Sequence, residues 1–315
     1  MTMTAARRLL TLLLAWVAIL VTFQVVVPGG RFLGVDNLLD LSQQVSINAI
    51  LAIGMTLVIL IGGIDLSVGA VVALTGVVAV AALPQAGAAG AVLAALACGG
   101  AVGMLNGAFA ARTRMPAFII TLATMLAARG AALRFNEGRP MPVALTASGF
   151  LAIGNARLGG WLPVPVALML ATFAVAGIVL HRTRFGQHLY AIGGNREAAR
   201  FTGIGIARDE FAVYAACGAL AGLAGVVHAS QLYSAEPGSG QGFELNAIAA
   251  AVVGGTSFTG GVGTMPGTLL GALIIGTLDK GLNQASVHYS LQYIIKGAVI
   301  LAAVWFDVRR REGGK

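Results

Sequence analysis

Hydrophobic residues follow one another in long runs along most of this chain, and short polar segments separate the runs. A membrane-spanning helix needs about 20 mainly apolar residues, and the pattern predicts roughly ten such stretches, some short enough to indicate broken helices. They lie near residues 9–27, 45–62, 67–84, 88–111, 116–135, 163–181, 210–232, 244–257, 266–284 and 290–306. The pattern therefore predicts an all-α, polytopic integral membrane protein, with residues 1–315 forming a single transmembrane domain.

The composition supports this fold class. Hydrophobic residues make up 57% of the chain, charged residues only 10%, and the mean hydropathy is +0.87. These values exclude the two soluble domains that the length alone would allow. The 44 glycines suit helices that pack closely through small side chains. No small-residue cleavage site follows the apolar run 9–27, so we interpret it as a retained first span and not as a signal peptide.

Positive charges are distributed unevenly between the two sides that ten spans would define. Ten spans place both termini on one side, and thirteen of the 20 basic residues fall there, against four in or near the opposite loops. The thirteen are Arg7, Arg8, Arg112, Arg114, Arg182, Arg184, Arg196, Arg200, Arg208, Arg309, Arg310, Arg311 and Lys315, and the four are Arg31, Arg134, Arg139 and Arg157. Loops rich in Lys and Arg face the cytoplasm, so both termini are expected there. The net charge of +8 is then an orientation signal and does not indicate nucleic-acid binding.

The longest polar segment on that side, residues 182–209, separates the sixth and seventh predicted spans. Asn195 is a good N-cap residue, Ala198 and Ala199 favour a helix, and Gly203 can end a helix in the left-handed conformation. We therefore expect a helix of about two turns over residues 194–203, outside the bilayer. Its small and apolar side chains, Ala199 in particular, would fit a groove on a partner protein.

Two interrupted stretches have similar sequences. Asn48 lies in a run that leads to the glycine pair at 62–63, and Asn246 lies in a similar run that leads to the pair at 254–255. The similarity predicts a parallel duplication of two halves, with chance likeness between glycine-rich helices as the alternative. Transporters are often built from such repeats, in which discontinuous helices surround the pathway.

Asp65 is a carboxylate within the apolar part of the sequence. A carboxylate in hydrocarbon costs about 2.5–3.5 kcal/mol, so Asp65 should face protein, water or the cytoplasmic edge. Three roles are open for it. It could cap the helix that starts near Leu66, with the help of Ser67; it could contact the permeating solute; or it could relay protons.

Motifs for catalysis and metal binding are missing from the sequence. The one Gly-Lys pair, Gly314-Lys315, ends the chain, so no P-loop is available and ATP hydrolysis by this chain is not expected. His188 is expected to be a solvated surface residue, and His228 lacks Cys, Asp or Glu at ligand spacing. We therefore expect no catalytic residue, no metal and no cofactor bound by this chain.

Five stretches resemble the permease subunits of ABC importers of the ribose and monosaccharide class. They are 63–69, 116–122, 186–204, 244–249 and 254–263, so the resemblance covers nearly the whole chain. It implies a permease of the bacterial inner membrane that moves a monosaccharide, such as a ribose-like pentose, into the cytoplasm. It further implies an ATPase subunit that binds ATP and Mg, a periplasmic or lipid-anchored sugar-binding protein, and a second permease subunit, identical or homologous.

The resemblance also implies roles for particular residues. Coupling to the ATPase is assigned to Gly194, Asn195, Glu197, Ala198, Ala199, Arg200, Gly203 and Ile204. A sugar is neutral, so small polar side chains suffice to line its pathway, and the candidates are Asn48, Asp65, Ser67, Asn246, Thr256 and Ser257. The rival hypothesis is a stand-alone secondary transporter or channel for a small polar solute, with Asp65 coupling an ion. It does not explain a short helix between glycines in the long cytoplasmic segment.

Overall fold

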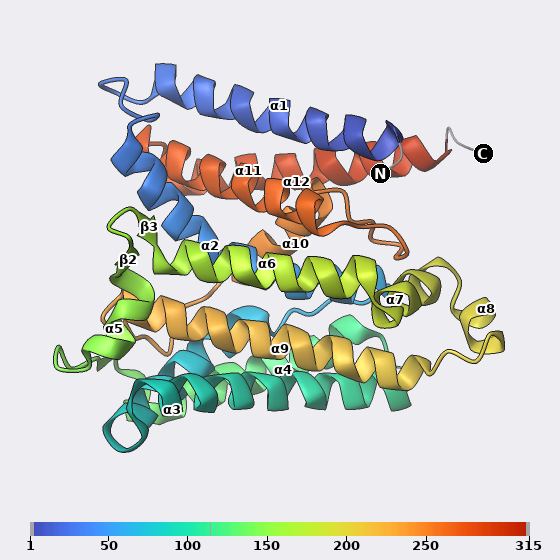
Figure 1. The fold of residues 1–315 in the computed structure, drawn as a ribbon, viewed down its shortest axis with the longest axis horizontal. Coiled ribbons are helices and arrows are strands. Elements are labelled where there is room, and N and C mark those ends of the chain that lie inside the picture. The colour runs from blue at the N-terminus through green and yellow to red at the C-terminus, as the bar shows by residue number, and fades with distance from the viewer. Residues whose placement is uncertain (1–2, 114, 313–315) are drawn as a thin grey trace.

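The computed structural model describes residues 3–113 and 115–312, and Arg114 and Lys315, counted above among the basic residues, lie outside them. The chain forms a bundle whose long helices run roughly side by side (Figure 1). In chain order the helices are α1 (Met3–Val26), α2 (Val35–Leu60), α3 (Val68–Arg112), α4 (Ala117–Arg134), the 3-10 helix η1 (Phe135–Gly138), α5 (Ser148–Asn155), α6 (Val164–Arg182), α7 (Arg184–Gly194), α8 (Arg196–Phe201), α9 (Ile206–Gln231), α10 (Phe243–Val253), α11 (Met265–Gln284) and α12 (Tyr289–Glu312). The strands have two residues each and form two antiparallel pairs, β1 (Met141–Pro142) with β4 (Ser234–Ala235) and β2 (Arg157–Leu158) with β3 (Leu162–Pro163).

Six helices within the described ranges are long and apolar enough to cross a membrane, namely α1, α2, α3, α4 extended by η1, α6 and α9. Shorter apolar helices occur at Phe243–Val253 and Tyr289–Ala302. The all-α, polytopic membrane fold is therefore confirmed. The count of ten spans stays a prediction.

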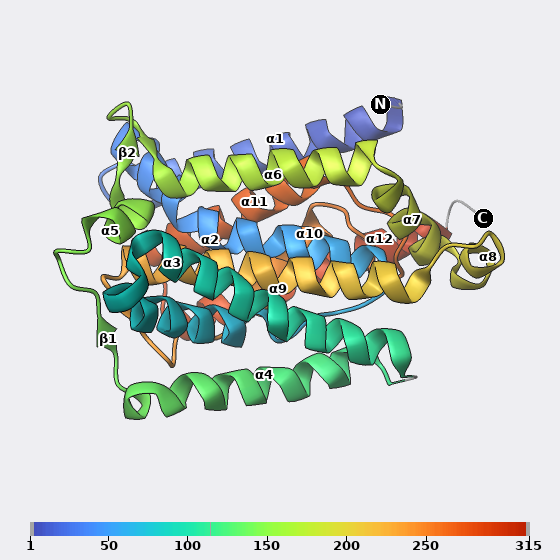
Figure 2. The ribbon, with the colours of Figure 1, turned by 60° about the horizontal axis from the view of Figure 1, so that its bottom comes forward.

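The 45-residue element α3 contains two of the predicted spans. Gly87 has φ 64° and ψ −173°, which is not helical, so the element consists of stretches 68–86 and 88–112 joined at a sharp turn (Figure 2). Both stretches pack on α9 through glycines. A Cβ on Gly99 would overlap the Gly218 carbonyl, and a Cβ on Gly76 would lie 3.3 Å from the Gly225 carbonyl oxygen. The glycines therefore allow the helix backbones to approach closely, as their abundance predicted.

Two expectations about the helices are wrong, those for the start of α2 and for the segment that contains α7, and one is met. α2 begins at Val35, ten residues before the predicted start at 45, because the polar residues after Val35 continue the helix. α10 has only 11 residues, about 16 Å of helix, which agrees with the expectation that some of the stretches are short, broken helices. α7 occupies 11 residues of the segment where one short helix was expected. Its glycines gave a weak helix signal, and tertiary packing supplies what intrinsic propensity does not.

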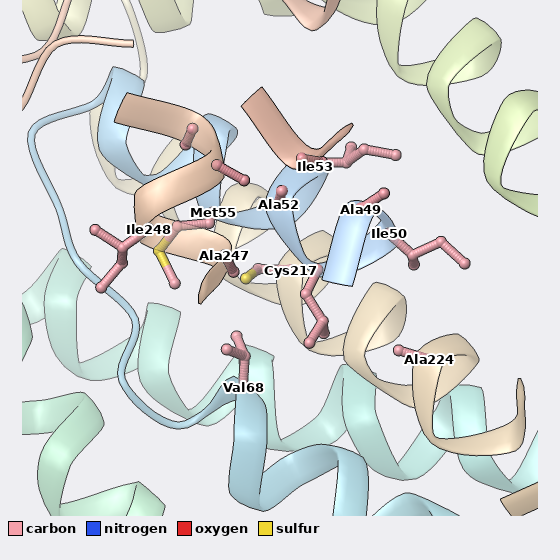
Figure 3. Packing of buried hydrophobic residues seen from close by; sticks show 14 of the residues in the cluster. Ala49, Ile50, Ala52, Ile53, Met55, Val68, Cys217, Ala224, Ala247 and Ile248 are labelled. Atoms are coloured by element: carbon pink, nitrogen blue, oxygen red, sulfur yellow. The ribbon is translucent and has the colours of Figure 1, made fainter. Parts of the chain in front are cut away.

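α2 lies at the centre of the hydrophobic core. All its residues from Val45 to Leu60 except Asn48 are buried, so it is apolar on every side, as expected for a helix surrounded by other helices. Figure 3 shows α2 residues from Ala49 to Met55 packed among Val68 at the start of α3, Cys217 and Ala224 of α9, and Ala247 and Ile248 of α10.

The two ends of the bundle differ in character. α7 and α8 lie at one end, where α1 begins and α12 ends, while α5 and the strands β1, β2 and β3 lie at the other (Figures 1 and 2). Prolines and glycines in the segment 136–162 prevent a long helix there, and between α4 and α6 the chain forms only η1, α5 and short strands. We refer to the two ends of the bundle as the α8 end and the α5 end.

Candidate functional site

The short helix expected in the polar segment is present as α8. The Asn195 side chain accepts a hydrogen bond from the N–H of Ala198 at 2.9 Å, which caps the helix start. Gly203 follows the helix end with φ +83°, the conformation predicted for it. α8 has six residues, fewer than the predicted range 194–203, because Gly194 ends the preceding helix α7.

Two backbone bonds complete the C-terminal cap of α8. The N–H of Gly203 donates to the carbonyl of Arg200 at 3.1 Å, and the N–H of Ile204 donates to the carbonyl of Ala199 at 3.2 Å. This bond pair is the Schellman motif, which satisfies carbonyls that a helix end leaves free. Both ends of α8 are therefore fixed, although the helix is too short to be stable alone.

The faces of α8 differ from the expectation at one residue. Glu197, Ala198 and Arg200 are exposed, and Phe201 is 90% exposed. Ala199 is only 4% exposed, because the turn of the helix directs its methyl group into this chain. The expectation that Ala199 fills a groove on a partner is therefore wrong, and Phe201 is the large apolar side chain that α8 presents outward.

Two adjacent carboxylates near the start of α9 hold α7 and α8 in place. Glu210 accepts two hydrogen bonds from the Arg196 guanidinium, one of them from Nη2 to Oε2 at 2.9 Å. The hydrogen bond to Glu210 raises the pKa of Arg196 above its usual value. Asp209 lies 2.8 Å from Nδ1 of His188 on α7 and is almost fully buried. The expectation of a solvated His188 is therefore wrong, and the adjacent acidic residues 209 and 210 were the sequence signal that could have corrected it.

α7 in turn contacts the backbone of two distant segments. A Cβ on Gly193 would overlap both the Leu60 carbonyl oxygen at the end of α2 and the Gly261 N–H after α10, so only glycine fits there. The Gly261 N–H donates to the Leu60 carbonyl at 2.9 Å, and the Tyr190 hydroxyl donates to the Gly263 carbonyl at 2.7 Å. α7 thus lies directly against the end of α2 and the 254–264 loop.

The helices α2 and α10 end in the same way. Gly62 and Gly255 follow them with φ of +81° and +96°, and each is flanked by the Schellman bond pair. An irregular segment then leads to the next helix, 61–67 before α3 and 254–264 before α11. The similar sequences of the two stretches therefore correspond to similar local structures. Duplication of the whole halves stays a prediction.

Asp65 and Ser67 lie together in the first of these segments. The Ser67 N–H and hydroxyl donate to one Asp65 oxygen at 2.9 and 2.6 Å, and the Asn106 amide donates to the Ser67 hydroxyl at 3.0 Å. Asp65 and Ser67 are each 1% exposed. Ser67 is itself the N-cap residue of α3 and no side chain caps this helix, so the Asp65 contact forms a local turn before α3 and the capping role stays a prediction. Asn106, which completes the cluster, was missed because its partners are far from it in the sequence.

The other pathway candidates lie elsewhere in the fold. The Asn246 amide donates to Asp279 at 3.4 Å, and Asp279 forms a 2.8 Å ion pair with Lys296. Thr256 and Ser257 lie buried in the 254–264 loop. The structure therefore does not bring the six candidates into one cluster.

Two of these candidates carry buried oxygens without a protein partner. Within the described ranges, the Asn48 side-chain carbonyl on α2 and the Thr256 hydroxyl have no hydrogen-bond partner. Such atoms are uncommon in native proteins and are free to bind water or a solute hydroxyl. Over the same ranges, no three His, Cys, Asp or Glu side chains come together as metal ligands.

Comparison with known proteins identifies similar chains. The family described as "Branched-chain amino acid transport system / permease component" matches residues 37–304. The ribose import permease protein RbsC of Escherichia coli strain K12 is 45% identical over 290 residues, covering 89% of this chain and 88% of the relative. The protein of the same name from Bacillus subtilis strain 168 is 44% identical over 281 residues, covering 89% and 87%. The xylose transport system permease protein XylH of Haemophilus influenzae is 34% identical over 367 residues, covering 96% of each chain.

Proposed function

The chain belongs to the branched-chain amino acid transport system / permease component family, as a membrane permease subunit of an ABC sugar importer, and we propose that its cargo is ribose or a related pentose. The proposal of a pentose rests on relatives at 34–45% identity, which are ribose and xylose permeases. A neutral sugar is recognised through hydroxyl groups. The uncharged oxygens of Asn48 and Thr256 suit such a solute.

The observation that carries the mechanism is the chain of contacts from α8 inward. α8 is joined to α9 by Arg196 and Glu210, and α7 lies against Leu60 and the 254–264 loop. A movement imposed on α8 by a partner would therefore reach the ends of α2 and α10 without passing through a flexible linker. Asp65 and Ser67 follow the end of α2, and Thr256 and Ser257 follow the end of α10. We propose these four residues, together with Asn48 and Asn246, as part of the sugar pathway.

We propose that an ATPase subunit, which binds ATP and Mg, docks on the exposed face of α8. Glu197, Ala198, Arg200 and Phe201 would form that face, with Asn195, Gly203 and Ile204 fixing its shape. The α8 end would then be cytoplasmic and both termini with it, and the remaining short helices would complete about ten spans. A sugar-binding protein would deliver its cargo at the α5 end, and a second permease subunit would complete the pathway.

Reconstitution tests this function. The permease, its ATPase and its binding protein are placed in lipid vesicles, and uptake of labelled ribose is followed with ATP, without ATP, and with an imposed proton or sodium gradient. Uptake that requires ATP and the ATPase supports the proposal. Uptake by the permease alone, driven by an ion gradient, would contradict it and favour a secondary transporter.

A further inference from the structure

A polar cavity of about 480 Å³ opens at the α8 end, beside α8. It lies between the end of α2, the end of α3, the start of α4 and the facing surfaces of α8 and α9. Its lining includes Gly62, Arg112, Met115, Arg196, Arg200 and Tyr214. Its volume is in the range that holds small ligands.

The charges around the cavity are unbalanced. Among the described residues that line it are three guanidinium groups, from Arg112, Arg196 and Arg200, against the single carboxylate of Glu210. Glu210 is already bound by both terminal nitrogens of Arg196. Among the described residues, no carboxylate forms an ion pair with Arg112 or Arg200. A cavity with two uncompensated guanidiniums attracts an anion, and the planar fork of arginine matches phosphate oxygens especially well.

An apolar surface continues from the cavity along α4. Met115 lines the cavity and is 46% exposed, and Phe118, Ile119 and Leu122 follow it on α4 with 49%, 46% and 40% exposure. Figure 2 shows α4 at the edge of the bundle, with α3 on its inner side. A molecule with a phosphate in the cavity could therefore lay a hydrocarbon chain along α4.

We propose that this cavity binds the phosphate group of an anionic phospholipid from the leaflet at the α8 end. Arg112 and Arg200 contact the phosphate, and the acyl chain lies along Met115, Phe118 and Leu122. Basic pockets between membrane helices bind anionic headgroups through the same chemistry. The bound lipid would connect the end of α3 to α8, because Arg112 ends α3 and Arg200 belongs to α8. The lipid chemistry does not depend on which sugar is carried, and because Arg200 also belongs to the proposed docking face, lipid binding is measured on the permease without its ATPase.

The test measures lipid binding by the purified full-length permease in neutral detergent micelles. Dioleoyl phosphatidylglycerol is titrated and compared with dioleoyl phosphatidylcholine, whose net charge is zero. We expect the anionic lipid to bind more tightly, and its affinity to fall about tenfold in Arg112→Gln and in Arg200→Gln, as for the loss of one charged hydrogen-bonding partner. Arg208→Gln is the matched control, because Arg208 has an 86% exposed side chain, lies at the same end and does not line the cavity. It should bind as wild type.

A second measurement keeps the test decisive if one of the variants folds poorly. The midpoint of thermal unfolding is compared with and without phosphatidylglycerol, and we expect the lipid to raise it for wild type and Arg208→Gln more than for either cavity variant. Equal binding of both lipids by wild type, or wild-type affinity in both cavity variants, would overturn the site. Inorganic phosphate is tested separately. If it binds as tightly as phosphatidylglycerol, the acyl chain contributes nothing and the lipid origin is overturned.

Discussion

Gly193 lies so close to the carbonyl oxygen of Leu60 that a single added carbon would overlap it. The first residue belongs to α7 and the second ends α2, so this contact joins the polar segment to the most buried helix of the bundle. The Gly261 N–H, which is bound to the same carbonyl, brings the loop after α10 to the same point. A force applied at the α8 end therefore meets both interrupted helices at one place.

Gly193→Ala should disrupt this junction. The added methyl group meets backbone atoms that cannot rotate away, so we expect a loss of about 1–3 kcal/mol in stability and a strong loss of ATP-driven sugar uptake. Gly205→Ala is the matched control, because this glycine lies at the same end and the atom nearest to an added carbon there is Arg208 Cβ, at an ordinary contact distance of 3.9 Å. Uptake rates in vesicles compare the two variants. Equal rates would contradict the role of this junction in coupling.

Phe201→Glu should weaken docking of the ATPase. Phe201 is 90% exposed, so its replacement leaves the fold intact. A carboxylate would fit poorly in an ATPase groove that binds an apolar ring. We expect normal abundance in the membrane and at least about a tenfold loss of ATPase recovered on co-purification. Leu145→Glu, a 79% exposed leucine in the segment between α4 and α5, is the control. Undiminished recovery with Phe201→Glu would exclude this face as the docking surface.

Arg196→Met should loosen α8, because it leaves the nearly buried carboxylate of Glu210 without its partner. Breaking a fully buried pair costs about 3–5 kcal/mol, and the half-exposed Arg196 side chain reduces the expected loss to about 1–2 kcal/mol. Because Met at both positions removes the unpaired charge, the double variant with Glu210→Met should recover part of the loss. Thermal unfolding of wild type, the two single variants and the double variant gives a double-mutant cycle. Strictly additive losses of stability would argue against a direct ion pair.

Asp65→Asn should retain most transport activity. The amide oxygen of Asn can still accept the hydrogen bonds from Ser67, so we expect a loss of no more than about 1 kcal/mol of local stability. The measurement is ribose uptake at matched expression. If uptake depends on a proton or sodium gradient and collapses in this variant, Asp65 couples an ion and the capping role is insufficient.

The contact of Tyr190 with Gly263 should weaken at high pH. Burial raises the pKa of Tyr190 to about 12, against an ordinary value of 10.0. Because the folded state holds this proton more tightly, its contribution is complete below pH 10 and decreases as pH rises from about 10 to 12. Hydrogen exchange in α7 should therefore accelerate over that range in wild type beyond the chemical trend. Tyr190→Phe should lack the added acceleration, and identical profiles would refute the assignment.

The sequence by itself determined the class of fold and the two caps of α8. Long apolar runs have no other stable solution than membrane helices, because a bilayer cannot satisfy free backbone groups. Asn195 and Gly203 act through bonds within a few residues, so their roles are readable from local chemistry. The same holds for the Gly62 and Gly255 helix ends.

Only the tertiary structure decided which side chains meet across the sequence. The contacts of His188 with Asp209 and of Arg196 with Glu210 depend on how α7 and α8 fold back on α9. The direction of Ala199 depends on the same packing, and a six-residue helix has no apolar periodicity long enough to reveal it. The cavity between Arg112 and Arg200 likewise arises where the ends of α2 and α3 and the start of α4 meet α8 and α9, and no local pattern specifies that meeting.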